Sequence, residues 1–153
     1  MRKVFLILAA LFPLLCLNSC SDDESSSSYS VMVNVFIEGD LAYPSLVRLY
    51  NYDKAANFDK DAIVEMGDNQ ELVDENGNVI TPAYSSGEYS GVNTFEGIEP
   101  GRYIIVVLYQ PEGYSFPMFY YYGYKSITVD ESNNANLYKI DFQYEDSGKF
   151  VEF

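Results

Sequence analysis

The stretch "YSGVNTFEGIEPGRYIIVVLYQPEGYSF", residues 89–116, contains the pattern that decides the fold. We expect a strand up to Phe95, followed by a tight turn, because a proline and then a glycine at 100–101 suit the central positions of such a turn. The next segment, "RYIIVVLY", is apolar on both faces. A strand of that kind is typical of the centre of a sheet that is covered on each side. The stretch therefore predicts two strands, the second of them buried.

Period-two alternation extends this prediction in both directions along the chain. In "VMVNVFIEG" one face carries the residues at 31, 33, 35 and 37, with Asn34 and Phe36 opposite, and residues 45–52 alternate again. "ELVDENGNVI", residues 71–80, predicts a hairpin around Asn76-Gly77, where the turn requires positive φ. "YKSITVDE" and "NLYKIDFQYE" predict a closing antiparallel hairpin. Residues 53–70 are less regular and leave a short helix and a packed loop as alternatives.

About seven or eight short strands with almost no helix predict an all-β chain. We expect a single antiparallel β-sandwich, Ig-like in architecture, over residues 30–153. It would follow a leader at 1–19 and a short disordered tether at 20–29.

The motif Phe95-x-Gly97-Ile98-x-Pro100-Gly101-x-Tyr103-x-Ile105, followed by "PEGY" at 111–114, resembles prealbumin-like sandwich domains. It is most similar to collagen-adhesin B-type repeats and carboxypeptidase regulatory-like domains. The resemblance implies the fold and no particular activity. Some adhesin repeats join lysine to asparagine with the help of a glutamate four residues before the proline of the second motif. In this chain that proline is Pro111, and Val107 stands at the position of the glutamate. We therefore expect no such crosslink.

The composition excludes several classes of function. The formal net charge is −14 and the pI is near 4.1, so DNA, RNA and an anionic bilayer surface would repel the chain. Histidine is absent, which excludes Ser-His and Cys-His nucleophiles and His-ligated metals. We expect no metal, no cofactor and no disulfide between Cys16 and Cys20.

The acidic residues predict solvated turns and linkers rather than a catalytic pair. A paired-acid glycosidase is not excluded by the number of carboxylates alone, but most of them fall in turns and linkers. Calcium is an alternative at 74–78; an EF-hand loop, however, needs an acid or amide five places before its glycine, and Leu72 stands there. Turn chemistry explains that cluster better, and we predict that the protein is not an enzyme.

The amino-terminal part has the anatomy of a secretory leader. Arg2 and Lys3 precede "VFLILAALFPLLCL", residues 4–17, which as a helix would span about 21 Å, less than the roughly 30 Å of a bilayer core. The segment Leu17-Asn18-Ser19-Cys20 resembles the bacterial lipoprotein signal, although Asn18 departs from its small residues. The resemblance implies a diacylglycerol on the Cys20 thiol, cleavage before Cys20 and attachment to a membrane.

The segment after Cys20 resembles a surface-export signal. "SDDESSSS", residues 21–28, is polar and predicts a disordered tether. Ser21-Asp22-Asp23-Glu24 is similar to the short acidic signal of Bacteroidetes surface lipoproteins, which implies an outer-membrane protein facing outward.

The aromatic run "YSFPMFYYYGY", residues 114–124, is a candidate binding surface. Tyrosine joins a flat apolar ring to a polar tip, which suits sugar stacking or protein contact. The candidates for stacking are Tyr120, Tyr121, Tyr122 and Tyr124. The alternative is that these rings cover the sandwich edge or fill its open end.

Taken together, the sequence predicts a non-catalytic envelope lipoprotein whose domain serves binding, adhesion or assembly with a glycan or an envelope protein. One alternative is a glycan-binding module of a polysaccharide-uptake system. Another is a minor fimbrial or pilus-like subunit, because related sandwiches polymerise by adding a strand at an open edge.

Overall fold

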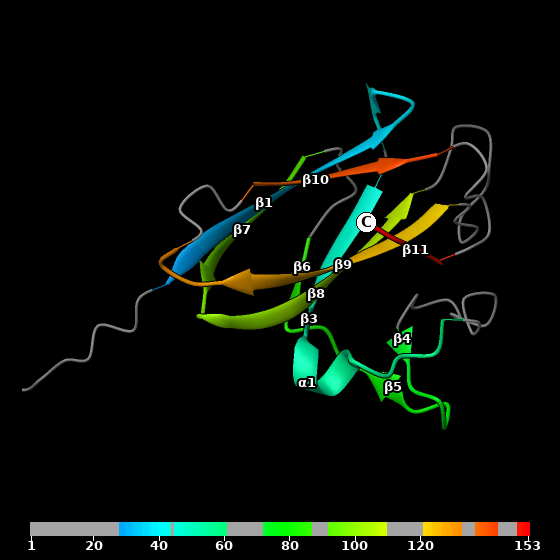
Figure 1. The fold of residues 1–153 in the computed structure, drawn as a ribbon, viewed down its shortest axis with the longest axis vertical. Coiled ribbons are helices and arrows are strands. Elements are labelled where there is room, and N and C mark those ends of the chain that lie inside the picture. Colours follow the sequence, from blue (N-terminus) through cyan, green and yellow to red (C-terminus); the bar gives the residue numbers. More distant parts are fainter. Residues whose placement is uncertain are drawn as a thin grey trace, which may run out of the picture.

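The computed structural model describes residues 28–43, 45–60, 72–86, 92–109, 121–132, 137–143 and 150–153. These residues form an all-β sandwich of two mixed sheets, with a small separate hairpin (Figure 1). The fold class predicted from the sequence is therefore confirmed.

The four-stranded sheet has β1 at its centre. On one side β1 (Tyr29–Ile37) pairs with β10 (Leu137–Phe142). On the other side it pairs first with β7 (Val92–Ile98) and, at its end, with the short β2 (Asp40–Leu41). The five-stranded sheet has the order β11-β9-β8-β3-β6. Its strands are β3 (Ser45–Asn51), β6 (Tyr84–Ser85), β8 (Gly101–Tyr109), β9 (Tyr121–Val129) and β11 (Phe150–Glu152).

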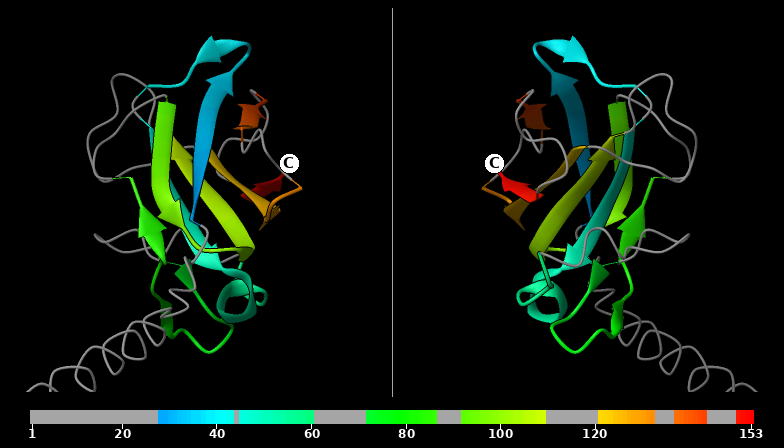
Figure 2. Two further views of the ribbon diagram at one scale, coloured as in Figure 1. Left: turned by 90° about the vertical axis from the view of Figure 1, so that its left-hand side faces the viewer. Right: turned by 90° about the vertical axis from the view of Figure 1, so that its right-hand side faces the viewer.

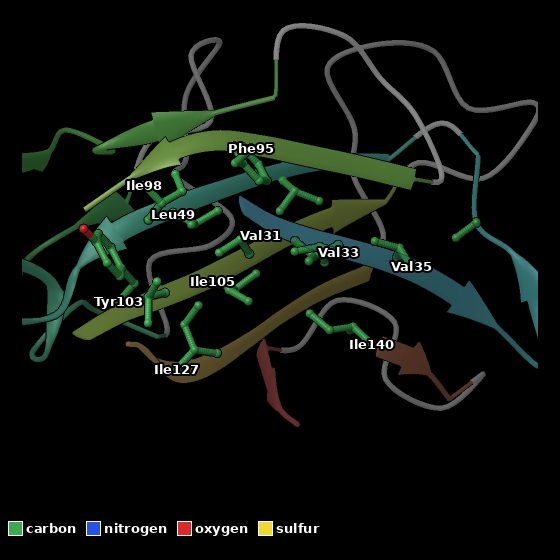
Figure 3. Close-up of a cluster of buried hydrophobic side chains, with 14 of the residues drawn as sticks. Val31, Val33, Val35, Leu49, Phe95, Ile98, Tyr103, Ile105, Ile127 and Ile140 are labelled. Carbon is green, nitrogen blue, oxygen red and sulfur yellow. The ribbon is translucent and has the colours of Figure 1, made fainter. Parts of the chain in front are cut away.

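The main core fills the space between the two sheets. Val31, Val33 and Val35 project from β1 into it and have no exposed surface, as the alternation in the sequence predicts (Figure 3). β8 contributes Tyr103, Ile105 and Val107 from the opposite sheet. The other face of β8 is buried as well, because Ile104, Val106 and Leu108 belong to a second apolar cluster. The prediction of a central strand covered on both sides is confirmed.

The insertion between β3 and β6 covers the outer face of the five-stranded sheet. It contains the helix α1 (Tyr52–Ala55) and the hairpin of β4 (Leu72–Val73) and β5 (Val79–Ile80). Ala55, Phe58, Leu72 and Ile80 are buried in the second cluster. Of the residues 53–70 that the sequence left open, α1 takes those up to Ala55 and Phe58 packs in the segment after it, while residues 61–70 lie outside the described residues. The insertion also explains why β3 is buried on both faces, although its sequence predicts only alternation.

The β4–β5 hairpin lies where the sequence places it, but its turn differs in detail. Gly77 has a φ of 78°, and its N–H donates to the Asp74 carbonyl over 2.9 Å. Among the described residues of this turn, positive φ falls on Gly77 and not on Asn76. The turn therefore needs one left-handed residue, which fits a hairpin loop longer than two residues.

One strand connection predicted from the sequence, the closing hairpin, is wrong in its partners. β9 and β10 do not form an antiparallel hairpin: β9 pairs with β8 and β11, whereas β10 lies in the other sheet, parallel to β1. The physical reason is burial, because beside β1 the side chains of Ile140 and Phe142 on β10 enter the main core. The β11–β9 pair is also parallel, so the sheets are mixed rather than purely antiparallel.

The turn at Pro100 joins the two sheets instead of two paired strands. β7 belongs to the four-stranded sheet and β8 to the five-stranded sheet. The left-handed glycine is Gly97, with a φ of 70°, at a point where the β1–β7 register shifts. The register shift is a β-bulge with an extra residue on β7, and a bulge bends its strand. The bend directs the end of β7 towards the connection with β8.

Replacing Gly123 of β9 with alanine should destabilise the protein. An added Cβ would lie 2.1 Å from Phe153 Cε2 and 2.9 Å from Phe142 Cε1. We expect Gly123→Ala to lower the free energy of unfolding by about 1–3 kcal/mol in chemical denaturation, because the rings must shift. Gly101→Ala is the matched control, since its nearest contact would be at 3.5 Å. An equal loss in a Phe153→Ala background would contradict this explanation.

Replacing Glu38 in the β1–β2 turn should stabilise the protein. Glu38 has a φ of 52° and Gly39 a φ of 89°, the pattern of a two-residue turn that prefers Asn-Gly. Glu38→Asn should raise the free energy of unfolding by about 0.5–1 kcal/mol, because asparagine tolerates left-handed backbone better. Glu75→Asn, in a turn position without positive φ, should give no such gain. Equal effects of the two changes on the denaturation midpoint would argue against backbone strain at Glu38.

Candidate functional site

The structure describes two of the predicted site residues in full. Cys20 and Tyr120 lie outside the described residues, and of Tyr121 only the backbone, at the start of β9, is described. Tyr122 and Tyr124 follow on β9 with 9% and 5% of their surface exposed. Their rings belong to the second apolar cluster. Both lack the exposed ring face that sugar stacking requires.

The partners of these two tyrosines come from distant parts of the sequence. The Phe58 ring packs edge-on against Tyr124, with centroids 5.1 Å apart. Phe150 of β11 lies 5.7 Å from Tyr122 and 6.0 Å from Tyr124, centroid to centroid. Tyr122 and Tyr124 therefore pack in the second cluster, against residues of the insertion and of β11.

The hydroxyl of Tyr124 links three segments of the chain. It donates to Glu152 Oε2 over 2.9 Å and accepts from Lys60 Nζ. Lys60 Nζ also lies 4.8 Å from the centroid of the Tyr124 ring, a distance at which a cation is attracted to the ring. The hydrogen bond to Tyr124 is the main cause that raises the pKa of Lys60. The arrangement ties β11 and the segment after α1 to β9.

A polar groove lies between α1 and the β4–β5 hairpin. One part of it, of about 330 Å³, is lined by Lys54, Asp74, Asn78 and the segment 79–81. An adjoining part of about 220 Å³ is lined by residues of α1 and of the hairpin turn. The groove therefore has lysine, carboxylate and amide groups along its walls.

The carboxylate of Asp74 is engaged in its own turn. Oδ1 accepts from the N–H groups of Asn76 and Asn78, each over 2.8 Å, and Oδ2 accepts from Asn78 Nδ2 over 2.9 Å. These hydrogen bonds, those from Asn78 first, lower the pKa of Asp74. Within the described part of the chain, no three His, Cys, Asp or Glu residues are placed to hold a metal ion. The cluster at 74–78 thus acts as a turn.

A surface that the sequence did not predict lies on the outer face of the four-stranded sheet. The exposed large hydrophobic residues among those described are Met32, Leu41, Tyr43, Val79, Val92 and Leu137. Four of these lie on that sheet, and Tyr43 follows β2 closely. The available signal was the alternation in β1, where Met32 and Phe36 occupy positions that a solvated face would fill with polar residues.

The polar groups described on this face are partly unsatisfied. Lys139 Nζ lies 3.9 Å from Asp141 Oδ2 and 4.5 Å from the centroid of the Phe36 ring. Asn34 Oδ1 and Asp141 Oδ1 are buried and have no hydrogen-bond partner among the residues that the structure describes. Buried acceptors without a donor are uncommon in folded proteins. The face therefore carries Asn34, Lys139 and Asp141 among its apolar residues, and two of their oxygens are buried without a donor in the described part of the chain.

Comparison with known proteins finds distant likenesses among solved structures. No protein-family profile matches the chain, and no curated protein sequence matches it. The chain is similar to GBS52, the minor pilin of the Gram-positive pathogen Streptococcus agalactiae, with 14% identity and a TM-score of 0.38 over 76% of this chain and 44% of the pilin. It is also similar to the backbone protein of group B streptococcus pilus 2b, with 14% identity and a TM-score of 0.37 over 74% of this chain and 39% of that one.

The chain thus spans less than half the length of each of these two structures. Likenesses with TM-scores this low say nothing about function. What the chain does must therefore be inferred from its own residues.

Truncating Tyr124 should act on stability. Tyr124→Ala should lower the free energy of unfolding by about 3–5 kcal/mol, because it removes a buried aromatic ring. Tyr124→Phe keeps the ring and loses the hydrogen bonds to Lys60 and Glu152, so we expect about 0.5–1.5 kcal/mol. Tyr43→Ala, at a residue with 65% of its surface exposed, is the control and should change the denaturation midpoint little. A Tyr124→Ala protein as stable as Tyr43→Ala would show that the ring is not packed.

Proposed function

We propose that the chain is a non-catalytic lipoprotein of the outer membrane that displays its β-sandwich outward for binding or assembly with another envelope component. The observation that carries the proposal is the order of segments. An apolar run ends in Leu17-Asn18-Ser19-Cys20, an acidic and serine-rich segment follows, and β1 begins at Tyr29. In the proposal the apolar run serves export and Cys20 carries the lipid anchor. The polar segment spaces the domain from the membrane, and the domain that begins with β1 is displayed.

Acylation at Cys20 would make the anchor durable. Each buried methylene contributes roughly 0.8 kcal/mol, and a single acyl chain binds a membrane only marginally, whereas two or more hold a protein persistently. Among the described residues, no helix is both long and apolar enough to cross a membrane. In the proposal the acyl chains on Cys20 hold the domain at the membrane.

Three tyrosines of the described domain are poorly suited to proton transfer near neutral pH. Burial raises the pKa of Tyr103 to about 12, and burial also raises the pKa values of Tyr122 and Tyr138. A general acid or base works best with a pKa near the operating pH. These shifts lead away from neutrality, as expected for hydroxyls that serve packing.

Metabolic labelling with a fatty-acid analogue tests the anchor. We expect label on the wild-type chain and none on Cys20→Ala, because the Cys20 thiol is the proposed attachment atom. Cys16→Ala is the matched control, since Cys16 is the other cysteine of the chain and lies in the proposed leader. Label on Cys20→Ala equal to wild type would refute the anchor.

Protease treatment of intact cells tests the outward orientation. A labelled chain that is digested without breaking the cells faces outward. A labelled chain that resists until the outer membrane is opened would retain the anchor and refute surface display.

A further inference from the structure

We propose that the outer face of the four-stranded sheet is the docking surface for a protein partner that has an apolar centre and a rim of lysine and arginine. We call this surface the outer apolar face; its apolar residues are Met32, Phe36, Leu41, Val92 and Leu137. The inference deepens the proposed binding function and rests on it, but it does not require the anchor at Cys20.

The strand register places the residues of the outer apolar face in neighbouring rows. Side chains at paired positions of neighbouring strands lie side by side on one face of a sheet. Met32 of β1 stands beside Leu137 of β10 and Thr94 of β7. Asn34 stands beside Lys139 and Val92, and Phe36 beside Asp141 and Leu41. These three rows run across the sheet, so apolar side chains from four strands lie on one face, with Asn34 and Lys139 in the middle row.

The sandwich covers its two outer faces differently. The outer face of the five-stranded sheet is closed by α1, Phe58 and the β4–β5 hairpin, whereas on the outer apolar face Leu137 retains 54% of its surface, Leu41 49% and Val92 42%. Contiguous apolar surface on a soluble domain usually marks an interaction site. In a chain of net charge −14, the grouping of these residues on one sheet points to a protein partner.

The acidic residues around the face indicate that its partner carries positive charge. Glu38 and Asp40, at the β1–β2 turn, and Glu96 on β7 are exposed, and Asp141 lies on β10. Lys139 also lies on this face, but its ammonium group is near the Asp141 carboxylate and over the Phe36 ring. An acidic rim attracts a cationic surface and repels a second copy of itself. It also repels nucleic acid and anionic lipid.

The chemistry of the face favours a protein over a glycan. Sugars stack on aromatic rings, but the exposed side chains here are aliphatic, and Lys139 lies over the ring of Phe36.

One further detail fits an interface. Glu38 keeps a left-handed φ of 52° at a position where asparagine would be less strained. A strained residue at a projecting turn is a frequent mark of function.

Site-specific photocrosslinking in cells that express the full chain tests the proposal. A photoreactive benzoylphenylalanine is placed at Leu137, on the face, or at Val79, in the β4–β5 hairpin. Val79 is a matched control because 57% of its surface is exposed, and the hairpin lies at the other end of the molecule from the β1–β2 turn (Figure 2). We expect an adduct with another protein from position 137 at least fivefold stronger than from position 79.

Identification of the crosslinked peptide and charge reversal complete the test. Mass spectrometry should place lysine or arginine beside apolar residues at the crosslinked site of the partner. Glu96→Lys should reduce the adduct from position 137 at least fivefold, whereas Glu75→Lys, in the hairpin turn, should leave it unchanged.

The other outcomes overturn the proposal. An adduct of twice the mass of the chain would assign the face to a second copy, and a carbohydrate adduct would assign it to a glycan. Equal adducts at 137 and 79, or none at 137, would remove the docking surface. Fatty-acid labelling in the same cells reports the anchor separately, so a lost anchor with a retained adduct is distinguished from a lost surface with a retained anchor.

Discussion

The burial of β8 on both faces is the constraint on which the rest of the molecule depends. A strand that is apolar on each side is stable only when both sides are removed from water. The four-stranded sheet covers one side through Val31, Val33 and Val35, and the insertion between β3 and β6 covers the other. The same requirement extends to the neighbours of β8, because Leu46 and Tyr50 of β3 and Tyr122 and Tyr124 of β9 belong to the second cluster.

The two outer faces of the sandwich differ in how far they are covered. The insertion closes the face of the five-stranded sheet and uses its aromatic residues for packing. The face of the four-stranded sheet keeps its apolar residues at the surface, framed by acids. The main core lies between the two sheets, and the second cluster lies beneath the insertion.

The sequence predicts those parts of the fold that depend on local pattern. β1, the buried β8 and the β4–β5 hairpin follow from periodicity and turn residues within a few positions. The pairing of β10 does not, because its partner β1 lies about a hundred residues earlier and nothing in "NLYKIDFQYE" distinguishes one sheet edge from the other. The same limit applies to the site: Phe58 and Phe150 cover Tyr122 and Tyr124 from remote positions. The outer apolar face likewise forms only when β1 brings β7 and β10 together.

The central place of β1 in its sheet also has a mechanical consequence. Any pull that reaches the domain through the residues before Tyr29 enters at β1, which is bonded to β10 over residues 32–37 and to β7 over residues 29–34. A force directed along this strand loads both ladders in shear, so many hydrogen bonds must break together rather than one after another. A domain held by this end under flow would resist extraction far better than one held by an outer strand.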